Sequence, residues 1–572
     1  MTFSILYLSD RGKGTAEKLA SALDGDIVRV GRGTLAENIG KCWNGTSVLV
    51  LVSSVGVAVR GIAPFLKDKA TDPAVIAVTE DGMEIITLVG AHLAGGSEAA
   101  WRIGSVLGRT PLVTTSSDRT GLLAPDLLSS RWKWKLKNKE ALVHVNSKLM
   151  KDEKLHCYVR DGIGPVPLPD YYESTGDTDK ADVIIDYGTS SLSAGQVQLV
   201  PPCLAAGIGC RKGIPSDSIR KTLDKVLRDN SLAAEAIREI RTIGEKTDEP
   251  GLLEAAEEMG IPVIEVSREK ILAQKGPFTL SAADKYFGIP GVAEPCAASA
   301  GPLIVPRAAC GGVTAAVSLD YRPPRGMLWI VGTGPGDRTY LTYQAGSKLQ
   351  EADTVIGYRL YVDLLPEEYL NGKRVERYGM GEEEMRVERA VSLAEAGHRV
   401  ALISGGDPIL FGLAALALRH AGNRTEAEVI PGLSAAQVAG SRMGAPYTNG
   451  LVMLSLSDYL QPWDRTMKAL EGAVSTGMTV ALYNPVKRDL DEKLAFVRKA
   501  FGSHPGKEIY LAGNAGRNGE TFRKIQLEDL SPADVDMRTM ILIPGKDTEE
   551  IGGTLMDKRG YTSEGKGGAA LK

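Results

Sequence analysis

A glycine-rich turn follows directly on an apolar strand at residues 328–342. The segment reads LWIVGTGPGDRTYLT and leads into the start of a helix. Glycine allows a backbone to approach a ligand closely, and N–H groups at a helix start point at whatever is bound. A dinucleotide fingerprint needs G-x-G-x-x-G, but Asp337 takes the sixth position and Pro335 stiffens the turn. The spacing therefore predicts a ligand loop and disfavours a nicotinamide dinucleotide.

Three further apolar runs end in small or turn-forming residues. They read RVALISGGDPILFG at 399–412, EVIPGLSAAQVAG at 428–440 and MTVALYNP at 478–485. In open α/β sheets, ligands bind beyond the carboxyl ends of the strands. We therefore expect the four loops to converge on one site.

The composition is that of an ordinary globular protein. The chain has 572 residues, 43% hydrophobic content and a formal net charge of −4. A chain of this length is expected to form about three to five domains. The slight acidic excess argues against a nucleic-acid partner, which would usually select a basic surface. The longest apolar run, residues 47–59, is too short to span a bilayer, and residues 1–23 resemble a strand, a turn and a helix more than a secretory signal. We therefore predict a cytoplasmic protein without a membrane partner.

Six cysteines are scattered without a C-x-x-C pair, which predicts buried thiols and no metal site. Residues 325–572 contain no cysteine, so an iron–sulfur cluster held within that half is excluded.

Pro323 and Pro324 mark the clearest boundary, inside SLDYRPPRG. We expect an α/β multidomain chain. The expected parts are a first α/β domain at 1–128, a small middle domain at 129–200, a second α/β domain at 201–320, a linker at 321–326, an α/β unit of two lobes at 327–550 and a disordered tail at 551–572.

The first half offers several side chains that could act on an anionic substrate. Arg60 follows a strand in GVAVRGIAP, and His92 precedes two glycines in VGAHLAGGSEAA. Arg211 and Lys212 lie between glycines in GIGCRKG, where two cations could hold an anion. Glu294 lies in GVAEPCAASAG. Each also has a structural interpretation, and a single histidine before glycines is more often structural than catalytic.

Taken together, GTGPGD, SGGDP, PGLSAA and ALYNP resemble the tetrapyrrole methyltransferases that use S-adenosylmethionine. The strings YGMGEEEMRVERA, LSLSDYLQPW and GNAGRNGE resemble the branch that methylates carbon 17 of cobalt-factor III or precorrin-3B and contracts the ring. The likeness covers residues 326–545 and implies a fold of two α/β lobes and a homodimer.

The resemblance also implies site residues. Asp337 would order its own loop or face the tetrapyrrole, as a candidate catalytic residue. The implied contacts to S-adenosylmethionine are Pro335, Gly405, Gly406, Asp407, Leu410, Ser434, Ala435 and Asn484. The implied substrate contacts are Arg359, Tyr378, Met380 and Asp458, each of which could equally be a packing or surface residue.

The first half resembles the cobalt-precorrin-5A hydrolases on the strings GVAVRGIAP, TTSSDRTGL, GIGCRKG, DEPGLLEAAEEMGIP and CGGVTAAVSL, over residues 5–319. The resemblance implies opening of a lactone with release of acetaldehyde, and cobalt enters only as part of the substrate. His92 or Glu294 would activate water, while Arg60, Arg211 or Lys212 would bind the substrate carboxylates.

One half would thus make the lactone that the other half opens. Two alternatives remain. The methyltransferase half could act at carbon 11 or on uroporphyrinogen, and the first half could be a corrinoid-binding module without catalysis.

Overall fold

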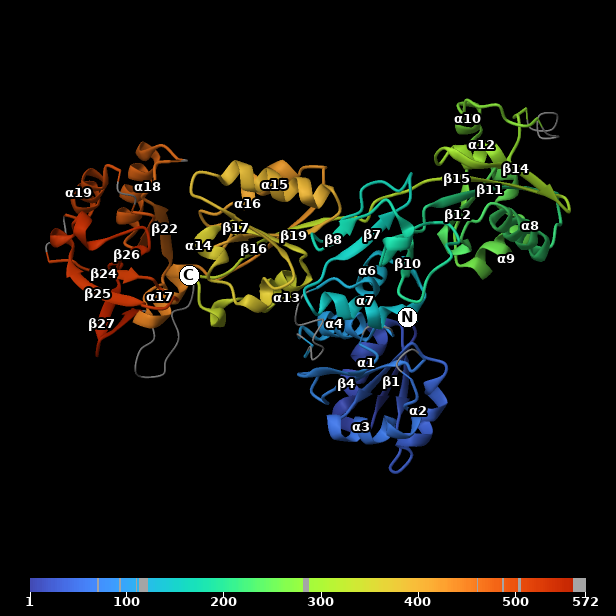
Figure 1. Cartoon of the computed structure of the whole chain (residues 1–572). Coiled ribbons are helices and arrows are strands. Elements are labelled where there is room, and N and C mark those ends of the chain that lie inside the picture. Colours follow the sequence, from blue (N-terminus) through green and yellow to red (C-terminus); the bar gives the residue numbers. More distant parts are fainter. Residues whose placement is uncertain are drawn as a thin grey trace, which may run out of the picture. The chain divides into compact units, whose positions relative to one another are not determined.

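The computed structural model describes residues 1–68, 71–91, 94–109, 111–112, 122–280, 288–459, 461–485, 488–502 and 506–558. The chain forms two compact units, Met1–Arg325 and Gly326–Lys572, which divide inside the proline-containing segment (Figure 1). His92 lies outside the described residues.

The first unit begins with a five-stranded sheet of order β2-β1-β3-β4-β5, in which only β5 runs antiparallel. Its apolar residues alternate between two clusters, one under α1 and α4 and the other under α2 and α3. The strands are β1 Phe3–Tyr7, β2 Asp26–Arg29, β3 Val48–Val52, β4 Ala74–Val78 and β5 Ile85–Val89. The helices are α1 Asp10–Leu23, α2 Leu35–Trp43, α3 Val55–Ile62 and α4 Gly96–Leu107.

A second sheet has the order β6-β10-β9-β7-β8. Its strands are β6 Lys135–Lys137, β7 Leu155–Val159, β8 Tyr172–Ser174, β9 Val183–Ile185 and β10 Val197–Val200. Helices α6 Pro125–Trp132 and α7 Leu142–Leu149 pack on it. The predicted domain boundary at residue 128 falls inside α6. Leu128 is fully buried in the same core as Leu136 and Leu199, so this helix belongs to the second sheet.

The third sheet has the order β13-β12-β11-β15-β14 and shares a hydrophobic cluster with the second. Strands β11, β12 and β13 are parallel, whereas β15 runs antiparallel to β11. The strands are β11 Leu204–Cys210, β12 Ile237–Thr242, β13 Val263–Glu265, β14 Leu303–Cys310 and β15 Val313–Leu319. The helices are α8 Ser216–Asp229, α9 Pro250–Met259, α10 Arg268–Leu272 and α12 Ala293–Ala298.

The second unit opens with an all-parallel sheet of order β18-β17-β19-β16-β20. Helices α15 and α16 cover one face, and α13 and α14 pack on the other (Figure 1). The strands are β16 Met327–Gly332, β17 Thr354–Tyr358, β18 Arg374–Tyr378, β19 Arg399–Ser404 and β20 Glu426–Ile430. The helices are α13 Tyr343–Glu351, α14 Arg359–Val362, α15 Glu383–Glu395 and α16 Ala414–Ala421.

The second lobe of this unit carries a mixed sheet of order β22-β23-β26-β24-β25. The strands are β22 Leu451–Ser455, β23 Thr479–Tyr483, β24 Glu508–Gly513, β25 Thr521–Gln526 and β26 Thr539–Ile543. Helices α18 Trp463–Thr476 and α19 Leu490–Phe501 pack on one side, and α17 Ala435–Met443 packs on the other.

The tail predicted to be disordered from residue 551 is partly ordered, so that prediction was wrong for residues 551–558. Strand β28, Thr554–Asp557, pairs with β27, Thr548–Ile551, and with β21, Gly444–Ala445. The glycine pair between β27 and β28 has positive φ, which suits a tight hairpin turn. Leu555 supplies the apolar anchor and is only 3% exposed. Residues 559–572 lie outside the described residues.

Among the residues that the structure describes, no helix has the length and apolar character needed to cross a bilayer.

Candidate functional site

Two of the glycine loops in the second unit are joined through their backbones. The Gly334 N–H donates to the Gly406 carbonyl at 3.2 Å, and the Gly406 N–H donates back to Gly334 at 2.7 Å. Both residues have positive φ, at 70° and 69°. The loops after β16 and β19 therefore meet at the carboxyl edge of the sheet, as the sequence predicted.

The third loop packs against the first two at backbone contact. A Cβ on Gly432 would lie 2.2 Å from the Gly406 carbonyl oxygen, and a Cβ on Gly332 would lie 2.6 Å from the Gly432 nitrogen. Such separations are too short for a real side chain, so glycine is the residue that fits these positions. We call these residues, Gly332, Gly334, Gly406 and Gly432, the glycine cradle, since the three loops meet there without side chains between them.

Asp407 fastens two loops of the cradle. Its side chain is buried, with Oδ1 accepting the Ile409 N–H at 2.9 Å and Oδ2 accepting the Gly432 N–H at 3.1 Å. A buried carboxylate needs such partners, because desolvation otherwise penalises its charge. Gly405 lies beside it, under the Tyr361 ring. Asp407 therefore holds the loop geometry in addition to any contact with a ligand.

The second lobe contributes the start of α17 and the end of β23. Ser434 precedes α17, and its N–H donates to the Gln437 side chain at 2.8 Å. The Ala436 N–H, one residue past Ala435, donates to the Tyr483 hydroxyl at 2.7 Å. Asn484 has a positive φ of 54° and reaches Ser455 at 3.2 Å. These contacts bring the ends of β22 and β23 to the start of α17.

Asp337 orders the turn after β16. Its Oδ1 accepts both the N–H and the hydroxyl of Thr339, at 2.8 and 2.7 Å. The hydroxyl hydrogen bond, followed by the N–H bond, lowers the pKa of the Asp337 carboxyl. The carboxylate of Asp337 is exposed, and its hydrogen bonds go to Thr339 within the same turn. The Asp337 backbone N–H donates to the Gly516 carbonyl at 2.8 Å.

Arg517 links the two lobes and was not singled out from the sequence. Its Nε donates to the carbonyl of Pro335, itself buried, and its guanidinium lies 5.9 Å from the centre of the Tyr361 ring. The string GNAGRNGE carried the only signal for it, an arginine between glycines and asparagines. Arg517 therefore closes the turn of the first loop from the second lobe.

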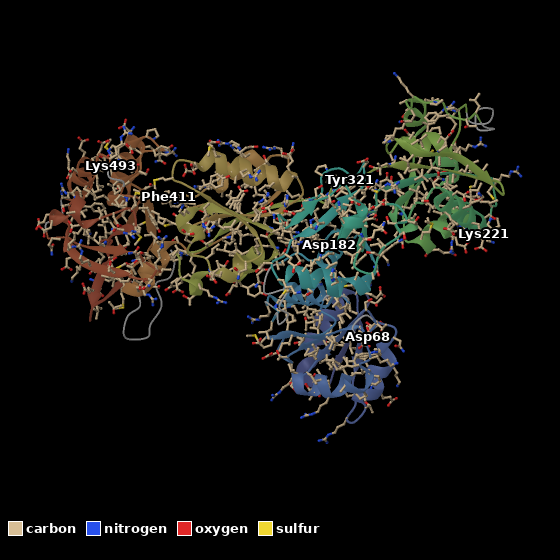
Figure 2. The ribbon with its side chains drawn as sticks, in the orientation of Figure 1. Asp68, Asp182, Lys221, Tyr321, Phe411 and Lys493 are labelled. Atoms are coloured by element: carbon tan, nitrogen blue, oxygen red, sulfur yellow. The ribbon has the colours of Figure 1, made fainter. Side chains whose placement is uncertain are left out.

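Large apolar side chains lie exposed on the loop after the cradle. Ile409, Leu410 and Phe411 are 70%, 36% and 51% exposed, and Phe411 packs 5.5 Å from Tyr483 between ring centres (Figure 2). Met380 is 67% exposed on the loop after β18. Exposed apolar residues that are neighbours in the chain, as Ile409, Leu410 and Phe411 are, can form an interaction surface.

The remaining predicted substrate contacts differ in their availability. Arg359 is exposed at the start of α14. Tyr378 donates to Glu376 at 3.2 Å, and burial is the main cause that raises the pKa of its hydroxyl. Asp458 forms an ion pair at 3.0 Å with Lys493, a buried lysine of α19 (Figure 2). The Lys493 hydrogen bond lowers the pKa of Asp458, so this carboxylate anchors the loop after β22.

In the first unit, Glu294 is a buried carboxylate at the start of α12. Its oxygens accept the backbone N–H groups of Thr279 at 2.7 Å and Arg307 at 3.1 Å. Both bonds join separate segments of the chain to the helix. Glu294 therefore acts as a structural anchor, and its use as a general base would require these bonds to loosen.

The predicted cations of the first unit lie on different sheets. Arg60 occupies the last turn of α3, on the first sheet. Arg211 and Lys212 are exposed directly after β11, on the third sheet. No hydrogen bond or ion pair connects Arg60 to either of them within the described ranges. Among the residues that the structure describes, no cluster of side chains could hold a metal ion.

The chain matches three family models. Residues 327–531 match the Tetrapyrrole (Corrin/Porphyrin) Methylases, residues 204–318 match Cobalamin synthesis G C-terminus, and residues 37–118 match Cobalamin synthesis G N-terminal.

Curated relatives match substantial parts of the chain. A "Cobalamin biosynthesis protein CbiHC" of Archaeoglobus fulgidus is 35% identical over 42% of this chain and 54% of its own length. This chain thus spans about half the length of that relative. A probable cobalt-factor III C(17)-methyltransferase of Salmonella typhimurium is 34% identical over 41% of this chain and 100% of its own length. A cobalt-precorrin-5A hydrolase of Priestia megaterium is 26% identical over 55% of this chain and 88% of its own length.

The glycine cradle lies within the methylase match, and the third sheet coincides with the C-terminal cobalamin synthesis match. The chain belongs to the tetrapyrrole methylases, in a form that carries the N- and C-terminal domains of cobalamin synthesis G ahead of the methylase unit.

Proposed function

We propose that the chain is a bifunctional enzyme of corrin-ring synthesis. Its second unit would methylate cobalt-factor III or precorrin-3B at carbon 17, with ring contraction and lactone formation. Its first unit would open the lactone of cobalt-precorrin-5A and release acetaldehyde. The methylase and cobalamin synthesis G models match separate parts of the chain, and relatives bearing these names match 41% and 55% of it, which supports the pairing. We also propose a cytoplasmic homodimer that associates through the methylase unit.

The glycine cradle is the observation that carries the methyltransferase assignment. Tetrapyrrole methylases use S-adenosylmethionine, which supplies an electrophilic methyl group. The cradle fits such a ligand by its place, because the loops after β16, β19 and β20 meet there at the carboxyl edge of a parallel sheet, where open α/β sheets bind ligands. Contacts to the methyl donor are proposed for Pro335, Gly405, Gly406, Asp407, Leu410, Ser434, Ala435 and Asn484.

The chain's own contribution to methyl transfer is orientation. The Asp407 carboxylate accepts a hydrogen bond from the Gly432 N–H and Arg517 donates one to the Pro335 carbonyl, and these bonds hold the loops that border the cradle. The exposed apolar loop around Phe411 offers an apolar surface from which a bound macrocycle would displace water. Holding donor and acceptor in line in such a site can lower the barrier by about 7 to 11 kcal/mol. No proton transfer to a protein group is needed before the new carbon–carbon bond forms.

Anaerobic incubation with cobalt-factor III and S-adenosylmethionine tests the methyltransferase assignment. We expect the tetrapyrrole to gain one methyl group and S-adenosylhomocysteine to form, both followed by mass spectrometry. Omission of either substrate is the control. Formation of a methylated product from uroporphyrinogen, with cobalt-factor III unchanged, would instead assign a sister methyltransferase.

The hydrolase assignment has its own assay. Cobalt-precorrin-5A should yield one acetaldehyde per macrocycle, trapped as a hydrazone. If the macrocycle binds and no acetaldehyde forms, the first unit is a corrinoid-binding module. Glu294 supports this alternative, because its buried carboxylate already accepts two backbone hydrogen bonds.

Replacement of Arg517 by alanine should weaken the methyl donor's site without unfolding the second lobe. Losing a charged hydrogen bond to the Pro335 carbonyl costs about 1.5 to 3 kcal/mol, so the KM for S-adenosylmethionine should rise at least about tenfold. Arg523→Ala, on the exposed face of β25, is the matched control and should leave the KM unchanged. Equal KM values for both variants would contradict the role given to Arg517.

A further inference from the structure

The carboxyl edge of the third sheet carries a second group of charged residues. Strand β11 ends at Cys210, and Arg211, Lys212 and Gly213 form the loop that follows. Gly213 has a positive φ of 72°, which turns the loop back toward the sheet. Neither the Arg211 guanidinium nor the Lys212 ammonium has an ion-pair partner within the described ranges.

Glu249 joins this loop to the next one along the sheet. It is only 7% exposed, its Oε1 accepts the Gly213 N–H at 2.5 Å, and its Oε2 lies 3.4 Å from the Lys246 Nζ. Lys246 and Glu249 lie between β12 and α9, so one buried carboxylate connects the loops after β11 and β12. Burial of that charge is tolerated because it has a cation and an N–H as partners.

Lys246 and Glu249 also lie close to the end of β11. Burial raises the pKa of the Cys210 thiol, the charge of Lys246 acts against that shift, and the charge of Glu249 adds to it. The charges of Lys246 and Glu249 therefore both act on Cys210, the residue that precedes Arg211. Arg211, Lys212 and Lys246 thus lie on the two loops that Glu249 joins, and the loop after β12 also carries the exposed carboxylates of Glu245 and Asp248.

The position of this group in the sheet is typical of ligand sites. Strands β11, β12 and β13 follow one another outward in one direction, while β15 and β14 lie on the other side of β11. Because β11 and β12 are parallel, the loops that follow them lie at one edge of the sheet, the carboxyl edge at which open α/β sheets bind ligands. Arg211 is held there, since its N–H donates to Gly312 at 3.2 Å and its side chain packs against that glycine.

We propose that Lys246, together with Arg211 and Lys212, binds a carboxylate of the polycarboxylated tetrapyrrole in the first unit, and that Glu249 is the positioning residue that aims Lys246. This inference rests on the proposed hydrolase function. The long 3.4 Å separation leaves the Lys246 ammonium free to take a second oxygen partner, and its side chain is 15% exposed. An ammonium and a guanidinium on adjacent loops suit an acetate or propionate side chain.

The test uses the full chain with Lys246→Ala, Lys246→Arg and Glu249→Gln. Acetaldehyde release from cobalt-precorrin-5A should show a KM raised about 10- to 100-fold in Lys246→Ala with kcat little changed, because a charged hydrogen bond is lost. Lys246→Arg should restore the KM to within a few-fold. Glu249→Gln should give an intermediate KM, since the amide no longer attracts the ammonium.

Two controls separate binding from folding. Lys221→Ala removes the same charge from an exposed position of α8 and should leave the KM unchanged (Figure 2). Methyl transfer by each variant should equal that of the parent chain, because the second unit is separate. An unchanged KM in Lys246→Ala would overturn the inference, as would a loss that Lys246→Arg does not restore.

A parent chain that releases no acetaldehyde would refute the proposed hydrolase and leave the binding site to be tested directly. Calorimetric titration with uroporphyrin III, a macrocycle with eight carboxylates, then compares the parent with Lys246→Ala. Loss or weakening of a binding event in the variant would support the site. Superimposable isotherms would overturn it.

Discussion

Gly432→Ala is expected to weaken binding of the methyl donor by up to about 100-fold, and methyl transfer with it, while acetaldehyde release continues. The new Cβ would lie 2.2 Å from the Gly406 carbonyl oxygen and 2.9 Å from the Gly332 carbonyl carbon. Both neighbours are backbone atoms, and the Gly406 carbonyl is already engaged by Gly334, so none of the three loops can move without breaking the cradle. Forced overpacking costs about 1 to 3 kcal/mol, which corresponds to a loss of affinity of up to about 100-fold.

Calorimetric titration with S-adenosylhomocysteine measures this effect directly. Gly472→Ala is the matched control, because Gly472 lies in α18 and a Cβ there would meet no atom within 4 Å. That variant should bind as the parent does and gain slightly in stability, since alanine favours a helix over glycine. Undiminished affinity in Gly432→Ala would show that the cradle does not form the ligand site.

Asp407→Asn should cost both stability and binding of the methyl donor. Asparagine keeps the volume of the side chain but replaces one acceptor oxygen with an N–H₂ group. That group must face either the Ile409 N–H or the Gly432 N–H, so one buried donor loses its partner. A hydrogen bond to a charged group contributes about 1.5 to 3 kcal/mol, so we expect the second unit to lose about 2 to 4 kcal/mol.

Differential scanning calorimetry with and without S-adenosylhomocysteine checks this expectation, since the ligand identifies the transition that belongs to the second unit. Asp529→Asn, an exposed position in the same unit, removes an equal charge and should change the transition little. A normal transition combined with full activity in Asp407→Asn would show that the loops are held by other contacts.

The loops of the methylase unit were predictable because their signals are local. Gly334 and Gly406 take positive φ, and a proline lies within two residues of Gly334, Gly406 and Gly432, so the turn signals come from a few neighbouring positions. The direction of parallel strands then places successive loops at one edge. Their convergence was confirmed in the backbone bonds between Gly334 and Gly406.

The tail and the carboxylates were harder to predict. The segment after residue 551 has little apolar content, yet one leucine and two strand pairings are enough to order residues 554–557. Glu294 looked like a candidate base, but it is engaged by Thr279 and Arg307. Glu249 stands at the N-cap of α9, and only the structure shows that its side chain also ties together the loops after β11 and β12.

The sequence by itself determined the strand-and-loop pattern, the ligand edge of the methylase unit and the resemblance to two enzyme families. The tertiary structure alone decided which charged groups are engaged and which are available. Asp407, Glu249 and Asp458 find their partners 25, 36 and 35 positions away in the chain. A glycine turn depends on its own backbone, but the availability of a carboxylate depends on the distant groups that folding brings to it.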